Sequence, residues 1–208
     1  MIIKNATFIT SAADKRGFIV PNKPMIAICG KSNVGKSSLI NTLANKKGLA
    51  RTSVTPGRTR LVNYFDFGEF VLADLPGYGF ARVSKGEKEK WAKTLDQFFK
   101  NKENIAHVFM LVDSRHDPTE DDVQMIEFLH FHTIPFTVTL TKADKLSRMK
   151  LKEHIKAIAA DLYLGANNLL ATSAETGYGK NDVLNKIHSV IELALSFEEV
   201  EEEEEDEE

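Results

Sequence analysis

Eight residues near the N-terminus have the composition and spacing of a loop that binds phosphate groups. Residues 30–37 read GKSNVGKS and match the pattern GxxxxGKS. Glycines at Gly30 and Gly35 let backbone N–H groups turn inward on phosphates, and the helix that follows adds the positive end of its dipole. Lys36 is expected to reach the β- and γ-phosphates of a nucleoside triphosphate, and the Ser37 hydroxyl to bind Mg²⁺. We expect nucleotide contacts from the whole loop: Gly30, Lys31, Ser32, Asn33, Val34, Gly35, Lys36 and Ser37.

A second segment, DLPG at residues 74–77, follows an apolar strand pattern. An acidic residue at the end of a buried strand is costly unless it has a partner, so Asp74 is expected to hold Mg²⁺ through a coordinated water. The Gly77 amide is then placed to meet the γ-phosphate, with Leu75 and Pro76 between the two. The alternative is an ordinary Asp that caps a turn, and the phosphate loop upstream disfavours it.

A third segment offers a carboxylate for the edge of a guanine base. Residues 141–144 (Thr141, Lys142, Ala143 and Asp144) also follow a buried strand pattern. Asp144 can accept hydrogen bonds from guanine N1–H and the 2-amino group, and a site of this kind rejects adenine, which lacks both donors, by ~10⁴. The stem of Lys142 is expected to pack along the base. Thr141 stands where Asn is commoner, so we expect a weaker brace on the phosphate loop.

Backbone groups after the last strand pattern are expected to close the base pocket, and they belong to Thr172, Ser173 and Ala174. One of the three segments could match by chance. All three, in the order phosphate loop, DLPG and TKAD, predict a guanine-nucleotide-dependent switch.

With two further features, these segments resemble the EngB-type (YihA/YsxC) bacterial ribosome-biogenesis GTPases, of the translation-factor-related P-loop class. The features are residues 49–53 leading to TPGRT at 55–59, and the extension of DLPG to DLPGYGFA at 74–81. The resemblance covers roughly residues 5–195. It implies a first switch that comprises Gly57, Arg58, Thr59, Arg60 and Leu61. Thr59 would be the second Mg²⁺ ligand, although Thr55 is another candidate. The family usually has Gln where this chain has Arg60, which adds charge beside the site.

The resemblance also implies an activity and partners. It implies a GTPase that hydrolyses GTP to GDP and acts as a switch in assembly of the large ribosomal subunit, and that is needed for normal cell division and septation. A large-subunit precursor or ribosomal RNA would be the partner, and we expect a monomer. Two other functions stay open: a binding module in which hydrolysis is incidental, and direct action at the division site.

The residue after the DLPG motif bears on catalysis. In many relatives a Gln there orients the attacking water, whereas this chain has Tyr78. We therefore expect slow intrinsic hydrolysis, accelerated by a partner or by an ion. Besides Lys36, the candidate catalytic residue is Asn33, since in similar K⁺-stimulated GTPases an Asn at this position helps to hold potassium. The alternative is an Asn that only fits the turn.

The net charge of −3 conceals a basic body. Ten of the 30 acidic residues lie in the last eleven positions, residues 198–208, which leaves 20 acidic against 27 basic residues, about +7, in the rest. We expect this tail to be disordered, as a solubilising segment or as a polyanion that competes with nucleic acid. Basic residues near the switches form either a solvated face or a surface for ribosomal RNA: Lys46, Lys47, Arg51, Arg58, Arg60, Arg82, Lys85, Lys88, Lys90 and Lys93. Trp91 beside them is expected in the core.

Composition indicates the cellular compartment in which the protein works. Cys29 is the only cysteine, which excludes an internal disulfide, and we expect it to be a small buried hydrophobe. The apolar runs are too short to span a bilayer, and the N-terminus does not have the pattern of a signal peptide. A cytoplasmic protein with no membrane partner is expected. The six histidines show no metal-ligand spacing.

The elements that must position these segments alternate between apolar runs and helical patterns, which predicts parallel strands joined by crossover helices. We expect an α/β, Ras-like P-loop GTPase fold over residues 1–197: a mostly parallel six-stranded sheet with one antiparallel edge pair and helices on both faces. Strands are predicted at residues 25–29, 61–67, 70–74, 105–113, 136–141 and 169–173. A helix is predicted over residues 37–44, and another starts with Asp117 as its cap and Pro118 in its first turn. Two more helices have apolar faces at Leu151, Ile155, Ile158 and Leu162, and at Val183, Leu184, Ile187, Val190, Ile191 and Ala194.

Overall fold

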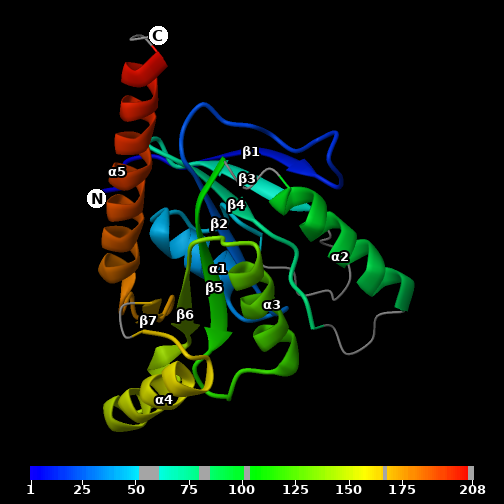
Figure 1. Cartoon of the computed structure of the whole chain (residues 1–208). Helices are drawn as coiled ribbons and strands as arrows, with labels where there is room; N and C mark the ends of the chain where they lie inside the picture. The colour runs from blue at the N-terminus through cyan, green and yellow to red at the C-terminus, as the bar shows by residue number, and fades with distance from the viewer. Residues whose placement is uncertain (52–60, 80–84, 101–103, 166–167, 206–208) are drawn as a thin grey trace.

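A seven-stranded sheet with helices on both faces organises the chain (Figure 1). The computed structural model describes all residues except 52–60, 80–84, 101–103, 166–167 and 206–208. The strands are β1 (Thr7–Ala12), β2 (Met25–Gly30), β3 (Val62–Asp66), β4 (Val71–Asp74), β5 (Ile105–Asp113), β6 (Phe136–Thr141) and β7 (Leu169–Ala171). The helices are α1 (Lys36–Leu43), α2 (Lys85–Phe99), α3 (Glu120–Phe131), α4 (Arg148–Asp161) and α5 (Lys180–Glu205), with a 3₁₀ turn, η2 (Ala143–Lys145).

The strands lie in the order β1-β3-β4-β2-β5-β6-β7. β2 pairs in parallel with β4 and β5, and the pairs β5–β6 and β6–β7 are also parallel. β3 pairs antiparallel with β4, as predicted, and also with β1. The predicted number of six strands is therefore wrong, because the edge strand β1 adds a seventh. Its sequence TFITSA is mostly exposed and has no apolar run, so no buried-strand pattern marks it.

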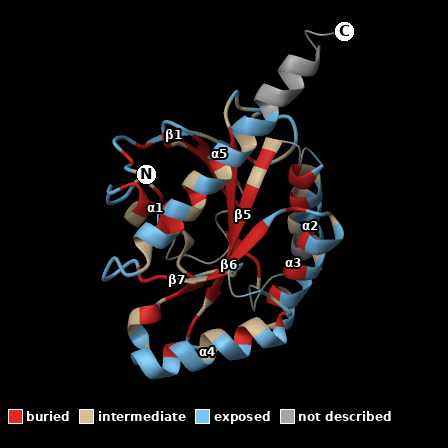
Figure 2. Cartoon of the chain, turned by 60° about the vertical axis from the view of Figure 1, so that its left-hand side comes forward, coloured by how far each residue is buried: buried red, intermediate tan, exposed pale blue. Residues whose placement is uncertain are grey.

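Two apolar cores lie on the two faces of the sheet. One core joins the sheet to α2, α3 and α4, and the other joins it to α1 and α5. Strands β2 and β6 are buried at every position, as expected of central parallel strands covered on both faces. Figure 2 shows many of the exposed residues on the helices that surround the sheet, such as α4. Cys29 is buried in β2, and burial raises the pKa of its thiol to about 12, which confirms its prediction as a small hydrophobe.

The carboxyl ends of the parallel strands meet at one edge of the sheet. The phosphate loop follows β2, DLPG includes the end of β4, TKAD includes the end of β6, and Thr172 follows β7. In open parallel sheets, ligands bind at this edge. The fold therefore brings together segments that lie more than 100 residues apart in the sequence.

Two helices differ from the prediction by more than one residue at one end. α3 begins at Glu120 with Thr119 as its N-cap, so Asp117 is not the cap. The Asp122 carboxylate accepts hydrogen bonds from the Thr119 N–H (2.9 Å) and hydroxyl (2.7 Å), which fixes the start of the helix two residues later. α5 continues to Glu205 and so includes residues 198–205, for which the sequence predicts disorder. Glutamate has a high helix propensity, which favours extension of a helix already held by its buried face.

The buried face of α5 matches the predicted pattern. Val183, Leu184, Ile187 and Ile191 are buried against the sheet, and Val190 packs at the margin. In α4, Leu151 and Ile158 are buried. Within the ranges that the structure describes, no helix has both the length and the apolar composition to cross a membrane.

Candidate functional site

The phosphate loop joins the end of β2 to the start of α1. Gly30 has φ 150°, and a Cβ there would lie 2.8 Å from the carbonyl oxygen of Leu111 in β5, so only glycine fits. Gly35, with φ 118°, is the N-cap of α1, and the first turn of that helix contains no acidic residue. The positive end of the α1 dipole is thus left for an anion, as the sequence predicts.

Asp74 lies at the end of β4 with only 7% of its surface exposed. Burial raises the pKa of its carboxyl group, while the charge of Lys36 and a hydrogen bond with the Asn63 side chain lower it. Its Oδ1 atom is buried and has no hydrogen-bond partner among the described residues. A buried carboxylate oxygen in this state suits a hydrated cation, so the residues present fit Mg²⁺. Ser37 lies in the first turn of α1, and Thr59 falls outside the described residues.

The DLPG segment contacts the phosphate loop. A Cβ on Gly77 would lie 3.1 Å from Lys36 Nζ and 3.2 Å from the Ser32 nitrogen, so the backbone of Gly77 passes close to the phosphate-binding lysine. One residue on, the carbonyl oxygen of Tyr78 accepts a hydrogen bond of 2.8 Å from the Ser32 N–H. The DLPG segment therefore lies close against the phosphate loop at Gly77 and Tyr78.

The side chain of Tyr78 points into the protein. It is 4% exposed, and its hydroxyl donates a hydrogen bond of 2.8 Å to Asp122 Oδ1 in α3. Its ring packs edge-on against Trp91, with ring centroids 5.6 Å apart, and Trp91 Nε1 donates to the carbonyl oxygen of Pro76 at 2.9 Å. Trp91 is half-buried against the core, in agreement with its prediction. Because the Tyr78 hydroxyl is bound to Asp122, it is not placed as a catalytic Gln would be.

Thr141 braces the phosphate loop through its side chain. Its buried hydroxyl donates a hydrogen bond of 2.6 Å to the carbonyl oxygen of Val34. The threonine side chain is short, but β6 ends next to the loop, and the Thr141 side chain lies within 3.9 Å of where a Gly35 Cβ would be. The bond is therefore made without the reach of an Asn side chain.

Lys142 links the phosphate loop to a carboxylate that the sequence reasoning did not single out. Its Nζ donates to the Asn33 carbonyl oxygen at 2.9 Å and to Asp113 Oδ2 at 2.8 Å. Burial raises the pKa of the Asp113 carboxyl, but hydrogen bonds from Arg115 and Lys142 outweigh it and hold the pKa well below its usual range. Asp113 holds the lysine stem beside the phosphate loop. The sequence could have indicated Asp113 as a site residue, because it ends a predicted buried strand at the same edge of the sheet as Asp74.

Asp144 is held as an ionised carboxylate. The Ser173 hydroxyl donates to its Oδ1 at 2.6 Å, and Lys145 Nζ lies 2.9 Å from its Oδ2. These two hydrogen bonds lower the pKa of Asp144, so it is charged at neutral pH and can accept two hydrogen bonds from guanine. Ser173 therefore acts through its side chain, in addition to the backbone role predicted for it. The Ala143 N–H donates to the Thr172 carbonyl at 3.1 Å, which ties the two base-binding segments together.

The structure thus brings together the three predicted motifs at one edge of the sheet, with the Thr172–Ala174 segment beside TKAD. Of the predicted first switch, Leu61 is described and is half-buried just before β3. The other residues of the predicted first switch lie outside the described residues: Gly57, Arg58, Thr59 and Arg60. The alternative ligand Thr55 also lies outside them.

Comparison with known proteins agrees with this geometry. A family model described as "50S ribosome-binding GTPase" matches residues 25–142. A probable GTP-binding protein EngB from Pelotomaculum thermopropionicum is 51% identical over 189 residues, which cover 90% of this chain and 96% of the relative. The chain belongs to the EngB family of GTP-binding proteins. It is a P-loop GTPase, an enzyme that hydrolyses GTP.

Other comparisons support the same family and fold. An EngB from Clostridium beijerinckii is 45% identical over 90% of this chain and 96% of its own length. The crystal structure of a probable GTP-binding protein engB superposes with a TM-score of 0.69 at 28% identity, over 81% of this chain and 98% of the other. The structure of Era in complex with MgGDPNP and a 16S ribosomal RNA fragment gives a TM-score of 0.63 at 20% identity, over 81% of this chain and 56% of Era. The likeness to Era shows the shared fold alone.

The Thr141 brace gives a first testable prediction for this EngB-family chain. Replacing Thr141 by valine leaves the Val34 carbonyl without its donor, which costs about 1–3 kcal/mol and is expected to weaken GDP binding by roughly 10- to 100-fold. Titration calorimetry with GDP measures the change. Thr141→Ser should keep the affinity within a few-fold, because the hydroxyl remains.

Thr139 is the matched control on the same strand. It is fully buried, and its hydroxyl has no partner among the described residues. Thr139→Val therefore makes the same chemical change without removing a bond, and GDP affinity should not fall. Equal losses for the two valine variants would show that the Thr141 hydroxyl does not brace the loop.

Proposed function

We propose that the chain is a nucleotide switch in assembly of the large ribosomal subunit: it binds an assembling particle with GTP and leaves after hydrolysis. The observation that supports this proposal is the close approach of the Gly77 backbone to Lys36 and Ser32. A γ-phosphate bound by Lys36 would enter beside Gly77 and displace the DLPG segment. Because Pro76 accepts the Trp91 hydrogen bond, that displacement would reach α2, where exposed basic residues lie. The matching family model is described as ribosome-binding, which supports the choice of partner.

Magnesium is part of this proposal. Ser37 and Thr59 would hold the ion directly, and Asp74 would hold it through a water. When bound, Mg²⁺ neutralises charge on the β- and γ-phosphates. Lys36 adds a positive charge on the same phosphates, and the Gly77 amide orients the terminal one.

We also propose that potassium, held by the Asn33 side chain, accelerates hydrolysis. Asn33 has φ 61°, which equally suits the alternative that Asn only fits the turn. Asn33→Gly separates the two, because glycine adopts this backbone without a side chain and keeps the carbonyl that Lys142 binds. Turnover should be faster in KCl than in NaCl, and Asn33→Gly should abolish the difference. Equal rates in both salts would contradict the potassium proposal.

Sedimentation through a sucrose gradient tests the switch itself. The full chain with a non-hydrolysable GTP analogue should migrate with large ribosomal subunits, and with GDP it should stay at the top. Migration that is the same with both nucleotides would contradict a switch, and no migration with either would contradict the partner.

Multiple-turnover GTP hydrolysis, with and without ribosomal particles, tests the second candidate, a binding module in which hydrolysis is incidental. This candidate is favoured by the residue after Gly77, which is Tyr78 where many relatives have a Gln that orients the attacking water. The Tyr78 hydroxyl is bound to Asp122 and so does not take that role. The switch proposal expects particles to stimulate turnover, and the binding module does not.

We further propose a cytoplasmic, monomeric protein whose effect on septation follows from ribosome supply.

A further inference from the structure

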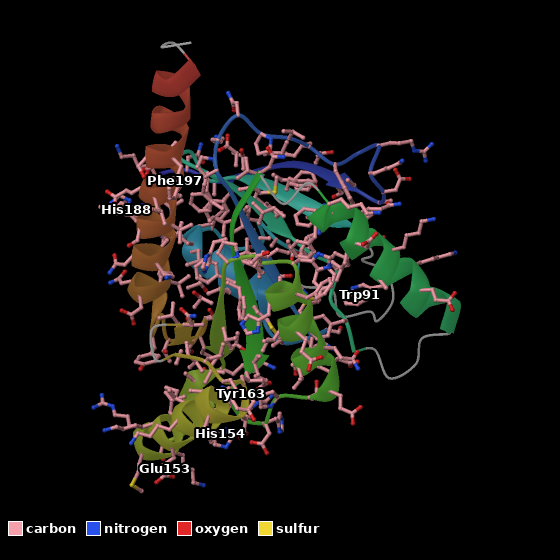
Figure 3. All side chains as sticks on the ribbon, in the orientation of Figure 1. Trp91, Glu153, His154, Tyr163, His188 and Phe197 are labelled. Atoms are coloured by element: carbon pink, nitrogen blue, oxygen red, sulfur yellow. The ribbon has the colours of Figure 1, made fainter. Side chains whose placement is uncertain are left out.

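A groove of about 450 Å³ lies beside the nucleotide site, between residues 13–16 and helix α2. Its apolar lining includes Leu61, Pro76 and Trp91, which is labelled in Figure 3. Its cationic lining comes from two elements: Lys15 and Arg16 after β1, and Lys90 and Lys93 in α2. A volume of this size falls within the range of about 300–1,000 Å³ for pockets that hold a small organic group.

The charge of the groove is strongly positive. Arg16 pairs with Asp14 at 3.0 Å, and Asp14 is the only acidic residue in the lining. Lys15, Lys90 and Lys93 are exposed, and none has an ion-pair partner within the described part of the chain. Lys90 and Lys93 are three residues apart in α2 and so share a face of the helix. Three ammonium groups that form no ion pair with any described residue therefore line the groove together with its apolar residues.

This combination selects the chemistry of the ligand. A half-buried indole with apolar neighbours suits the face of a nucleobase, and ammonium groups on both walls suit the phosphates on either side of it. Double-stranded RNA would not present a base to such a groove, because its bases are paired and stacked. We propose that the groove binds an unpaired nucleotide of RNA, with the base against Trp91 and the flanking phosphates on Lys15, Lys90 and Lys93.

The groove shares residues with the nucleotide switch. Pro76 belongs to DLPG and accepts the hydrogen bond from Trp91 Nε1, and Gly77 beside it lies against Lys36. Movement of DLPG therefore changes the floor of the groove. This inference rests on the proposed function for its RNA partner, and it adds the location of the RNA site and the means by which GTP and GDP would alter it.

Fluorescence makes the groove observable. Trp91 is the only tryptophan in the chain, so intrinsic emission reports this one position. The full chain, loaded with GDP or with a non-hydrolysable GTP analogue, is titrated with an unstructured ten-nucleotide oligouridine, a ten-base-pair RNA duplex and uridine monophosphate. Oligouridine should change the emission, with an affinity that differs between the two loaded forms. The duplex and the mononucleotide should bind at least 10-fold more weakly.

A charge-matched pair of triple variants tests the assignment. Lys15→Gln with Lys90→Gln and Lys93→Gln should weaken oligouridine binding at least 10-fold and lower the slope of log affinity against log salt by about 2, since each phosphate contact contributes about 0.7. Lys150→Gln with Lys152→Gln and Lys156→Gln removes the same charge from the exposed surface of α4 and should have a small effect. GDP calorimetry confirms that both variants are folded.

The possible outcomes distinguish a failure of the groove proposal from a failure of the proposed function. Equal RNA binding by the two triple variants would overturn the groove, and equal binding of uridine monophosphate would show a site for free nucleotides. If the groove variant still sediments with large subunits in a GTP-dependent way, the proposed function stands and the groove inference is wrong. If the unaltered chain binds oligouridine in the groove but never sediments with the subunits, the proposed function fails.

Discussion

Replacing Lys36 by methionine is expected to weaken binding of GDP and GTP by roughly 10²–10⁴-fold, because the loss of two hydrogen bonds to charged phosphates costs about 1.5–3 kcal/mol each. Methionine keeps the length and apolar character of the side chain, so the loss comes from the charge and the donors. Lys36 also offsets the burial of Asp74, whose pKa its charge lowers. The triphosphate carries more negative charge than GDP, so the loss of the Lys36 charge should weaken binding of the triphosphate by a larger factor than binding of GDP.

Calorimetric titration with GDP and with a GTP analogue measures this effect. Lys47→Met is the matched control, since Lys47 is exposed just beyond α1 and its change removes the same charge. A melting curve without nucleotide shows whether the Lys36 variant is folded. A folded Lys36→Met variant that binds GDP within threefold of the unaltered chain would mean that this loop is not the phosphate site.

Replacing Asp144 by asparagine is expected to lower GDP affinity by roughly 10³–10⁴-fold and to transfer the preference to xanthine nucleotides. Guanine offers two donors, N1–H and the 2-amino group, to the two carboxylate oxygens. An amide keeps one acceptor and turns its NH₂ donor toward the 2-amino group. Xanthine carries a carbonyl in place of that amino group, so it pairs with the amide and should be poorly bound by the carboxylate.

Competition of GDP, xanthosine diphosphate and ADP for a fluorescent nucleotide measures the change in preference. Ser173→Ala provides the graded comparison: it removes the 2.6 Å hydrogen bond that orients Asp144 but leaves the carboxylate. Its GDP affinity should fall about 10-fold with no gain for xanthosine diphosphate, in line with the loss of one hydrogen bond to a charged group. An Asp144→Asn variant that still prefers GDP over xanthosine diphosphate would place the base elsewhere.

The central strands were predictable from the sequence because their burial is continuous. β5 and β6 have the bounds expected from their apolar runs, residues 105–113 and 136–141. β1 was not predictable, because an edge strand with an exposed face carries no such run and is fixed by its pairing with β3. The start of α3 depended likewise on a side-chain contact, between Thr119 and Asp122, that competes with the equally plausible cap Asp117.

The chemistry of the site divides in the same way. The sequence alone determined the phosphate loop, DLPG and TKAD, because phosphates and guanine are bound by backbone groups and single side chains whose spacing along the chain is local. Only the tertiary structure decided how those groups are held: Thr141 on Val34, Lys142 between Asn33 and Asp113, and Ser173 on Asp144. The first two pairings with the phosphate loop join residues 107 and 109 positions apart, and they depend on which strands are neighbours in the sheet. No local pattern encodes that neighbourhood, which is set by the packing of both cores.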